Sequence, residues 1–539
     1  MRKDYLPHFF VGLCPGIGQT SPVNLLFLLF VFAFYTAKAA GRANILFIMS
    51  DDMGWAQPGF NGSPKKLTPN LDQLAKESLS LTQHYTHSVC APTRGAFLTG
   101  RYAFRHWSDW RSEDFGKPSY LKKLGLTLAK TADGEETRRI HALASEERTV
   151  AEALSEAGYF TSLIGKWHLG EWLPENLPMG QGFQHQYGHY GWGIDYYSKT
   201  IVHNAPARFA LYDWHRNQEP LQEKGYVTDL IAKEASRVIG EQTADKPFFM
   251  YVAFNAVHGP LNPPPNFKGD ASDPLAIRDA MLANLDTNVG SILKTLDQKG
   301  LRKNTLVVFT NDNGPVLEEM SAPYRGTKNT TYEGGVRTPC LVRWPEHTKP
   351  GTKKDGLTFV TDWFSTFINV AGASTKQELK TDSFNMAPTL FGEAPSPRNE
   401  IIYDVAGSVR LPTIRSGDYK LMGDVLYNIK LDPSENADLA SVNPDLVKKL
   451  KSRLAQAASE RPPLGDKPLL MEPPLPYIYG EAENKAVPEW LKKQVDAIRA
   501  TQPQTWAPGT TPWPQAPKGA NASKMTGGLD EKGAGAQKK

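Results

Sequence analysis

The chain has 539 residues, a length too great for one simple core, which predicts a large domain with a smaller one. Apolar residues make up 40% of the chain and charged residues 22%, which is ordinary for a soluble globular protein. The formal net charge of +4 is small for this length and gives no case for a nucleic-acid partner.

The N-terminus has the features of an export signal. Arg2 and Lys3 precede an unbroken apolar run at 25–35, and Ala37-Lys38-Ala39 follows with the small-x-small arrangement of a secretory cleavage site. A run of this length does not comfortably span a bilayer. We predict a signal peptide at 1–39 and an exported chain, with an uncleaved anchor as the alternative because the stretch before the run is long.

Cysteine usage bears on the compartment. Beyond the signal only Cys90 and Cys340 remain, so there is no disulfide framework, and an exported protein of this kind suggests a bacterial periplasm or exterior more than an animal lysosome. A glycosylation sequon at Asn329 adjoins a residue assigned below to the active site, where a glycan would obstruct it. This also favours a bacterial source.

Four apolar, β-rich segments each end in residues suited to chemistry. They are 44–49 before Asp51 and Asp52, 161–164 before Lys166 and His168, 248–254 before His258, and 306–309 before Asp312 and Asn313. Such continuous apolar runs fit strands buried on both faces, and ligand sites in α/β sheets gather at the carboxyl ends of the strands. All four clusters are therefore expected at one edge.

Helical patterns lie between these strands, beginning at Pro69, at Thr149 and before the stripe from Met281 to Leu296. This alternation predicts an α/β domain at 40–395, with a large mixed sheet sandwiched by helices. Short strand-like pieces at 401–403, 411–415, 419–422 and 425–429, then a helix from Asn443-Pro444, predict a small antiparallel subdomain at 396–460. The segment 461–539 is Pro-rich and is predicted to be extended and partly disordered.

Two acidic pairs point to a metal site. Asp51-Asp52 and Asp312-Asn313 each follow a buried strand, and oxygen ligands of this kind suit a hard cation, Ca²⁺ or Mg²⁺. Adjacent strand residues face opposite ways, so Asp51 and Asp52 share a metal only if the strand has already broken into a turn. The alternative is that the acidic residues cap the turns that follow.

The run Cys90-Ala91-Pro92-Thr93-Arg94 is the most informative stretch in the chain. Pro92 suits the first turn of a helix, so Cys90 is expected beside free backbone N–H groups, where an anionic ester can dock. Arg94 follows one helical turn later and can point its fork to the same side. The alternative is a buried thiol at a helix start with a surface arginine.

The chain resembles the type I sulfatases, whose cysteine at this position is converted into formylglycine (3-oxoalanine). The resemblance covers roughly 44–439 and rests on the Cys90 run and the acidic pairs together with Gly165-Lys166-Trp167-His168, Asn255-Ala256-Val257-His258, Arg325-Gly326-Thr327-Lys328 and Glu333-Gly334-Gly335. The nearest types in appearance are the arylsulfatases and the N-acetylgalactosamine-4-sulfatases. The resemblance implies an alkaline-phosphatase-like sulfatase fold.

The resemblance also implies a mechanism. One Ca²⁺ would be held by Asp51, Asp52, Asp312, Asn313 and residue 90, and the hydrated aldehyde at residue 90 would attack sulfur. Arg94 would steady the diol and metal ligands, and His168 would contact the diol as a base. Lys166, His258 and Lys328 would bind sulfate oxygens, and either His258 or Lys328 would protonate the leaving alcohol. The required partner is a formylglycine-generating or radical sulfatase-maturating enzyme.

The family's assisting hydroxyl has no counterpart in the region 181–197, which offers His189 and Asp195 instead. This region and the stretch 102–120 are rich in aromatic residues, which we predict to stack on sugar rings of a sulfated carbohydrate. Those aromatic residues are Tyr102, Phe104, Trp107, Trp110, Phe115, Tyr187, Tyr190, Trp192, Tyr196 and Tyr197. The alternative is that they pack the insert between Arg101 and His141.

The predicted activity is hydrolysis of sulfate monoesters, on a sulfated glycan or an aryl sulfate. The rival activity is that of a phosphomonoesterase or phosphonate monoesterase, which a second metal would favour, but the chain offers ligands for one. A third reading is a non-catalytic sulfated-glycan-binding protein in which Cys90 is not converted. The sequence does not determine the sugar or the oligomeric state.

Overall fold

The computed structural model of the protein describes residues 42–106, 142–143, 146–170, 174–201, 211–243, 246–405, 411–461, 488–491 and 493. The predicted signal peptide at 1–39 lies outside these residues, as does most of the predicted tail at 461–539. Within the tail, Leu491 is buried and the ring of Trp490 lies edge-on to Tyr212, 5.5 Å between centroids. No helix in the described ranges has the length and apolar character needed to cross a bilayer.

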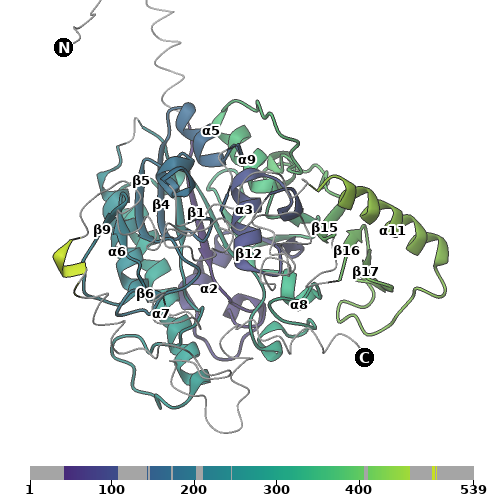
Figure 1. Cartoon of the computed structure of the whole chain (residues 1–539), viewed down its shortest axis with the longest axis horizontal. Coiled ribbons are helices and arrows are strands. Elements are labelled where there is room, and N and C mark those ends of the chain that lie inside the picture. Colours follow the sequence, from purple (N-terminus) through teal and green to yellow (C-terminus); the bar gives the residue numbers. More distant parts are fainter. Residues whose placement is uncertain are drawn as a thin grey trace, which may run out of the picture. The chain divides into compact units, whose positions relative to one another are not determined.

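A sheet of ten strands in the order β13-β2-β12-β11-β1-β10-β4-β5-β8-β9 carries the fold (Figure 1). The five neighbours from β11 to β5 run parallel, whereas β12 pairs antiparallel with β11, so the sheet is mixed as predicted. The strands are β1 Asn44–Ser50, β2 Leu79–Leu81, β4 Phe160–Lys166, β5 His185–His189, β8 His215–Arg216, β9 Glu219–Pro220, β10 Phe248–Ala253, β11 Thr305–Asn311, β12 Cys340–Arg343 and β13 Thr352–Lys354.

The four predicted chemistry-bearing strands are β1, β4, β10 and β11, and they lie side by side at the centre of this sheet. Every residue of β1, β10 and β11 is buried, which explains their continuous apolar sequences. Because the four strands are parallel, their carboxyl ends meet at one edge of the sheet. The predicted convergence of the four clusters on that edge is confirmed.

Helices cover the sheet in two groups, α3, α5 and α9 in one and α2, α6 and α7 in the other (Figure 1). Thr149 begins α5 with a capping box to Glu152, which fixes where that helix starts. Against β1, the ring of Phe47 stacks on Phe97 of α3 with centroids 4.1 Å apart. The bounds are α2 Pro69–Lys76, α3 Cys90–Thr99, α5 Val150–Glu156, α6 Val227–Glu241, α7 Pro274–Gln298, α8 Glu333–Val336, α9 Asp362–Ala371 and α10 Ala387–Leu390.

The other short elements of the described residues are the strand pairs β3 His84–Tyr85 with β14 Thr358–Phe359 and β6 Thr200–Ile201 with β7 Leu211–Tyr212, and six 3-10 turns. Those turns are η1 Gly59–Asn61, η2 Ala103–Arg105, η4 Pro174–Asn176, η5 Pro178–Gln181, η7 Arg302–Asn304 and η8 Glu318–Ser321.

A second, antiparallel sheet follows in the order β15-β16-β17-β18, with α11 packed beside it (Figure 1). Its strands are β15 Glu400–Asp404, β16 Thr413–Ser416, β17 Tyr419–Met422 and β18 Val425–Asn428, and the helix is α11 Pro444–Ser459. The predicted small antiparallel sheet with one helix is therefore confirmed. The boundaries drawn at 395 and 460 between domains stay predictions.

A buried cluster of charges joins the second sheet to α8. Lys420 of β17 places its Nζ 2.9 Å from Glu333 Oε1 and 2.7 Å from Glu435 Oε1, and all three side chains are fully buried. Tyr85 Oη donates to Glu333 Oε2 at 2.6 Å, and the Glu333 N–H donates to Glu435 Oε2 at 2.6 Å. The second sheet thereby fixes α8, which follows the loop that carries Lys328.

Replacing Lys420 by methionine is expected to destabilise the protein strongly, because Glu333 and Glu435 then lose the cation between them. Breaking a buried ion pair from one side costs about 3–5 kcal/mol. We expect the free energy of unfolding in urea to fall by this order. As a control, Lys430→Met removes an exposed lysine 3.8 Å from Asp418 and should change that free energy by less than about 0.5 kcal/mol. Equal losses in the two variants would contradict the central role of the cluster.

Candidate active site

The two acidic pairs meet in space at the carboxyl ends of β1 and β11. Strand β1 ends at Ser50, and Asp52 has a left-handed φ of 57°, so the strand has broken where the two aspartates sit. One carboxylate oxygen from each of Asp51, Asp52 and Asp312 lies within 4.8 Å of the others. The turn that allows Asp51 and Asp52 to share one metal ion is therefore present.

Cys90 is the first residue of α3 and is 3% exposed. Its Sγ lies within 4.8 Å of ligand atoms of Asp51 and His258. Thr93 Oγ1 donates to the Asp312 backbone carbonyl at 2.7 Å, which ties the first turn of α3 to the end of β11. Burial raises the pKa of the Cys90 thiol to about 11, so an unmodified thiol is protonated at neutral pH and is a poor nucleophile.

Arg94 bridges the two carboxylate-bearing strands. Its Nη2 donates to Asp51 Oδ2 at 3.0 Å and to Asp312 Oδ2 at 2.8 Å, and the whole side chain is buried. Its Nη1 donates to the Lys166 carbonyl at 3.2 Å and to Tyr251 Oη at 3.4 Å. The alternative of a surface arginine is therefore wrong, because α3 packs Arg94 into the centre of the site.

Lys166 is the last residue of β4, and His168 follows it at the same edge of the sheet. Lys166 Nζ donates to Asp51 Oδ2 at 2.6 Å, and its side chain is fully buried. His168 has a left-handed φ of 59°. Burial, together with the charges of Lys166 and Arg94, holds the pKa of His168 well below its usual value, so its ring is neutral at neutral pH.

His258 and Lys328 face Asp52. Lys328 Nζ lies 2.8 Å from Asp52 Oδ1, and His258 Nε2 lies 3.8 Å from Asp52 Oδ2. Nδ1 of His258 is 2.6 Å from the Gly259 carbonyl, which only accepts hydrogen bonds, so this nitrogen carries the proton of the neutral ring. Burial and the charge of Lys328 lower the pKa of His258 to about 4, and Nε2 is therefore an acceptor at neutral pH.

The acidic group fits a hard cation. Asp51 Oδ1 and Asn313 Oδ1 are buried oxygens with no hydrogen-bond partner in the structure. Burial and the charge of Asp51 raise the pKa of Asp312 to about 7, so its charged form is disfavoured when no metal ion is bound. Ca²⁺ binds clustered carboxylate and amide oxygens of this kind. Asp51, Asp52, Asp312 and Asn313 are the residues that would hold it.

The prediction that the aromatic stretches form exposed stacking faces is wrong for five of the seven rings that the structure describes. Five of the rings lie in the hydrophobic core: Tyr102, Phe104, Tyr187, Tyr190 and Tyr196. Trp107, Trp110 and Phe115 lie outside the described residues. Tyr197 is 46% exposed, and the partly buried Trp192 lies edge-on to His258 with ring centroids 5.5 Å apart. Of the seven described rings, only Trp192 is both partly exposed and in contact with the His258 ring.

The two substitutes for the family hydroxyl have other surroundings. Asp195 accepts from the N–H groups of Tyr197 and Ser198 at 2.9 and 2.7 Å, so it caps its own turn. His189 is fully buried and pairs in register with Lys166 across β4 and β5, and burial lowers its pKa to about 3. The Tyr251 hydroxyl on Arg94 was not anticipated, because this residue lies within the apolar run of β10.

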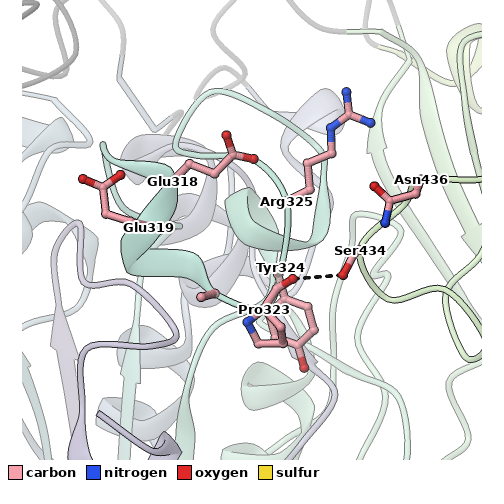
Figure 2. A pocket seen from close by; sticks show the side chains of 8 residues that line it. Glu318, Glu319, Pro323, Tyr324, Arg325, Ser434 and Asn436 are labelled. Carbon is pink, nitrogen blue, oxygen red and sulfur yellow. Dashed lines mark hydrogen bonds between the residues drawn. The ribbon is translucent and has the colours of Figure 1, made fainter. Parts of the chain in front are cut away.

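A groove of about 450 Å³ opens between η8 and the segment 434–436 (Figure 2). Glu318 and Glu319 line it with Tyr324 and Arg325, and Ser434 Oγ donates to the Pro323 carbonyl across it at 3.0 Å. Two carboxylates against one guanidinium give this groove no excess of positive charge. It is therefore poorly suited to a polyanion, in contrast to the Cys90 site.

Comparison with known proteins places the chain in a family. The sulfatase family model matches residues 43–373, and the model described as N-sulphoglucosamine sulphohydrolase, C-terminal, matches 327–460. N-acetylgalactosamine-6-sulfatase of Mus musculus is 31% identical over 69% of this chain and 70% of its own length. Arylsulfatase A of Homo sapiens is 31% identical over 77% of this chain and 88% of its own length.

Among solved structures, Ps i-CgsB is similar with a TM-score of 0.65 and 27% identity, covering 78% of this chain and 94% of that one. A second structure of Ps i-CgsB, in complex with k-i-k-neocarrahexaose, is 26% identical. The chain belongs to the sulfatase family, whose members are sulfuric ester hydrolases. The expected likeness to arylsulfatases is confirmed, whereas likeness to the 4-sulfatase type stays a prediction because the amino-sugar relative named above is a 6-sulfatase.

Calcium is expected to stabilise the protein through the acidic group. At a hundredfold excess over the dissociation constant, a ligand specific for the folded state adds about 2.7 kcal/mol. Chelator-treated protein should therefore show a higher melting temperature after Ca²⁺ is added, and Asp312→Asn should lose most of this increase. Asp297→Asn, which alters an exposed carboxylate at the end of α7, should retain it. An identical increase in the Asp312→Asn protein would contradict the assignment of the metal ligands.

Proposed function

We propose that this protein hydrolyses sulfate monoesters of sulfated carbohydrates, using a formylglycine made from Cys90 and one Ca²⁺. The observation that carries the proposal is the position of Cys90 Sγ within 4.8 Å of ligand atoms of Asp51 and His258 at the end of a buried helix. Arg94, Lys166 and Lys328 surround this point with positive charge. The three carboxylates offset this charge, and a Ca²⁺ bound to them makes the balance of the site positive, so that it attracts an anionic ester.

Residue 90 supplies the nucleophile after conversion. The buried thiol is protonated at neutral pH, whereas a hydrated aldehyde at the same position carries hydroxyl groups, one of which attacks sulfur. Conversion requires a partner, a formylglycine-generating or radical sulfatase-maturating enzyme. His168, which is neutral at neutral pH, takes a proton from the second hydroxyl, and the C–O bond to the sulfate then breaks, so that sulfate leaves and the aldehyde is restored.

The calcium ion, when bound, would neutralise carboxylate charge and polarise a sulfate oxygen as a Lewis acid. Asp51, Asp52, Asp312 and Asn313 hold it, and Arg94 keeps Asp51 and Asp312 in place by its two hydrogen bonds. These groups are fixed before substrate arrives, so little reorganisation is needed when charge develops on the ester.

The cations of the site divide the remaining tasks. Lys166 and Lys328 bind sulfate oxygens from the sides of Asp51 and Asp52. His258 has its proton on Nδ1, held by the Gly259 carbonyl, so Nε2 has no proton to give while the ring is neutral. Lys328 is a better source of the proton for the leaving alcohol, because its ammonium group carries one at neutral pH.

The proposed substrate class is a sulfated carbohydrate. One relative is named for the 6-sulfate of N-acetylgalactosamine, and one similar structure holds an oligosaccharide. Trp192 beside His258 offers an apolar surface on which a sugar ring can pack. We also propose that the protein is exported, on the strength of the N-terminal sequence.

Mass spectrometry of the Cys90 peptide tests the proposal first. In a host with a converting enzyme, the peptide should be lighter than the cysteine form by about 18 Da, as loss of the thiol in favour of an aldehyde requires. The converted protein should hydrolyse aryl sulfate, and Cys90→Ala should reduce kcat at least about a thousandfold. Faster hydrolysis of aryl phosphate than of aryl sulfate would support the phosphoesterase instead. An unmodified cysteine beside a converted control sulfatase would support a binding protein.

Replacing Trp192 by alanine should affect carbohydrate substrates more than small ones, because only the former pack on its ring. We expect kcat/KM for a sulfated oligosaccharide to fall about tenfold more than for an aryl sulfate, the equivalent of about 1.4 kcal/mol. Tyr197→Ala is the control, since this exposed ring packs against Tyr226 and not against His258. Equal losses on the two substrates would refute the packing role of Trp192.

A further inference from the structure

A buried arginine whose two terminal nitrogens have no hydrogen-bond partner among the described residues lies close to the active site. Arg278, in the second turn of α7, is 1% exposed, and neither Nη1 nor Nη2 has a hydrogen-bond partner in the structure. It shares the inward face of the helix with Met281 and Leu285, which are apolar. A charged group in such surroundings is costly unless another charge pairs with it.

The chain topology explains why Arg278 is close to the site. Helix α7 follows β10 and the loop that carries His258, so its first turns start at the carboxyl edge of the sheet (Figure 1). Burial lowers the pKa of Arg278, and the largest opposing effects come from Asp52 and Tyr196. Tyr196 Oη in turn donates to the carbonyls of Asn255 and His258 at 2.8 and 2.9 Å.

Arg278 differs from the other cations of the site in having no carboxylate of its own. Arg94 pairs with Asp51 and Asp312, Lys166 pairs with Asp51, and Lys328 pairs with Asp52. No ion pair within 4.0 Å involves Arg278 in the described part of the chain. Three carboxylates therefore face three paired cations, and Arg278 is a fourth cation that an incoming anion can pair with.

The exposed fraction of Arg278 is similar to that of the other residues assigned to substrate binding. Lys166 is 0% exposed and His258 4%. These residues are assigned to the sulfate ester under the proposed function. An exposure of 1% is therefore compatible with contact between Arg278 and a bound substrate.

We propose that Arg278 binds a second anionic group of the substrate, a sulfate or carboxylate on the sugar that carries the scissile sulfate or on its neighbour. The proposal rests on the proposed function and extends it to substrate choice. A guanidinium forms two parallel hydrogen bonds to a carboxylate or to two sulfate oxygens, which suits either group. The preferred substrate is then a polyanionic carbohydrate.

The test compares three substrates on the converted enzyme: a monosulfated disaccharide, its disulfated counterpart, and a monosulfated disaccharide containing a uronic acid. The wild type should show a higher kcat/KM for at least one of the dianionic substrates, and which one identifies the second group. Arg278→Met should reduce this preference at least about tenfold, as expected for loss of a charge-assisted hydrogen bond. Arg278→Lys should retain a larger part of it, because it keeps the charge.

Arg302→Met is the matched control, since it removes the same charge from an arginine just beyond the other end of α7, where it pairs with Glu77 and Asp297. It should leave the preference unchanged, and melting temperatures of all variants report whether they fold. A wild type without preference for dianionic substrates, or an unchanged preference in Arg278→Met, would overturn the inference and indicate internal water around the guanidinium. A wild type that hydrolyses no sulfate ester would overturn the proposed function as well.

Discussion

The double hydrogen bond from Arg94 to Asp51 and Asp312 is the interaction on which the site depends. It joins the ends of β1 and β11, two adjacent parallel strands, through a residue on α3. The same helix begins at Cys90, so the contact that orders the carboxylates also fixes the position of residue 90. Because the side chains are fully buried, the electrostatic attraction is little screened by solvent, and loss of any one member leaves a buried charge without compensation. The nucleophile and the metal ligands are therefore held in place by the same interaction.

The second sheet contributes to the same site from a distance. Lys420 and Glu435 hold Glu333 at the start of α8, and the segment that leads into α8 carries Lys328. The Gly314 N–H donates to the Gly335 carbonyl at 2.8 Å, and a Cβ on Gly314 would lie 1.9 Å from the Gly334 carbonyl oxygen, so the loop after β11 packs directly on α8. Asn313 on one side and Lys328 on the other are therefore positioned by the same backbone contact. This explains why the Glu-Gly-Gly sequence at 333–335 accompanies Lys328 even though it supplies no group to the ester.

The strands and the convergence of Asp51, Lys166, His258 and Asp312 were predictable because long apolar runs identify buried parallel strands, whose ends share an edge. The C-terminal sheet was predictable from alternating short segments and turn residues. The aromatic residues were not, since a tyrosine in an irregular segment has no periodicity to assign it to core or surface, and Tyr187, Tyr190 and Tyr196 are buried. Arg278 was missed although its helix has a clear periodicity. It stands in phase with the apolar stripe of α7, three residues before Met281, but a single charged residue in a helix is ordinarily exposed.

The charges of the site set a limit on what it binds. Asp51, Asp52 and Asp312 balance Arg94, Lys166 and Lys328, so without further charge the site has little attraction for an anion. A divalent cation held by the carboxylates makes the balance positive by two, enough for one sulfate monoester with one charge left over. Arg278 adds a further positive charge that forms no ion pair with a carboxylate of the described residues. A monoanionic ester therefore leaves part of this charge unpaired in a buried environment, whereas a polyanionic carbohydrate pairs it, and the difference in pairing favours the substrate with more than one anionic group.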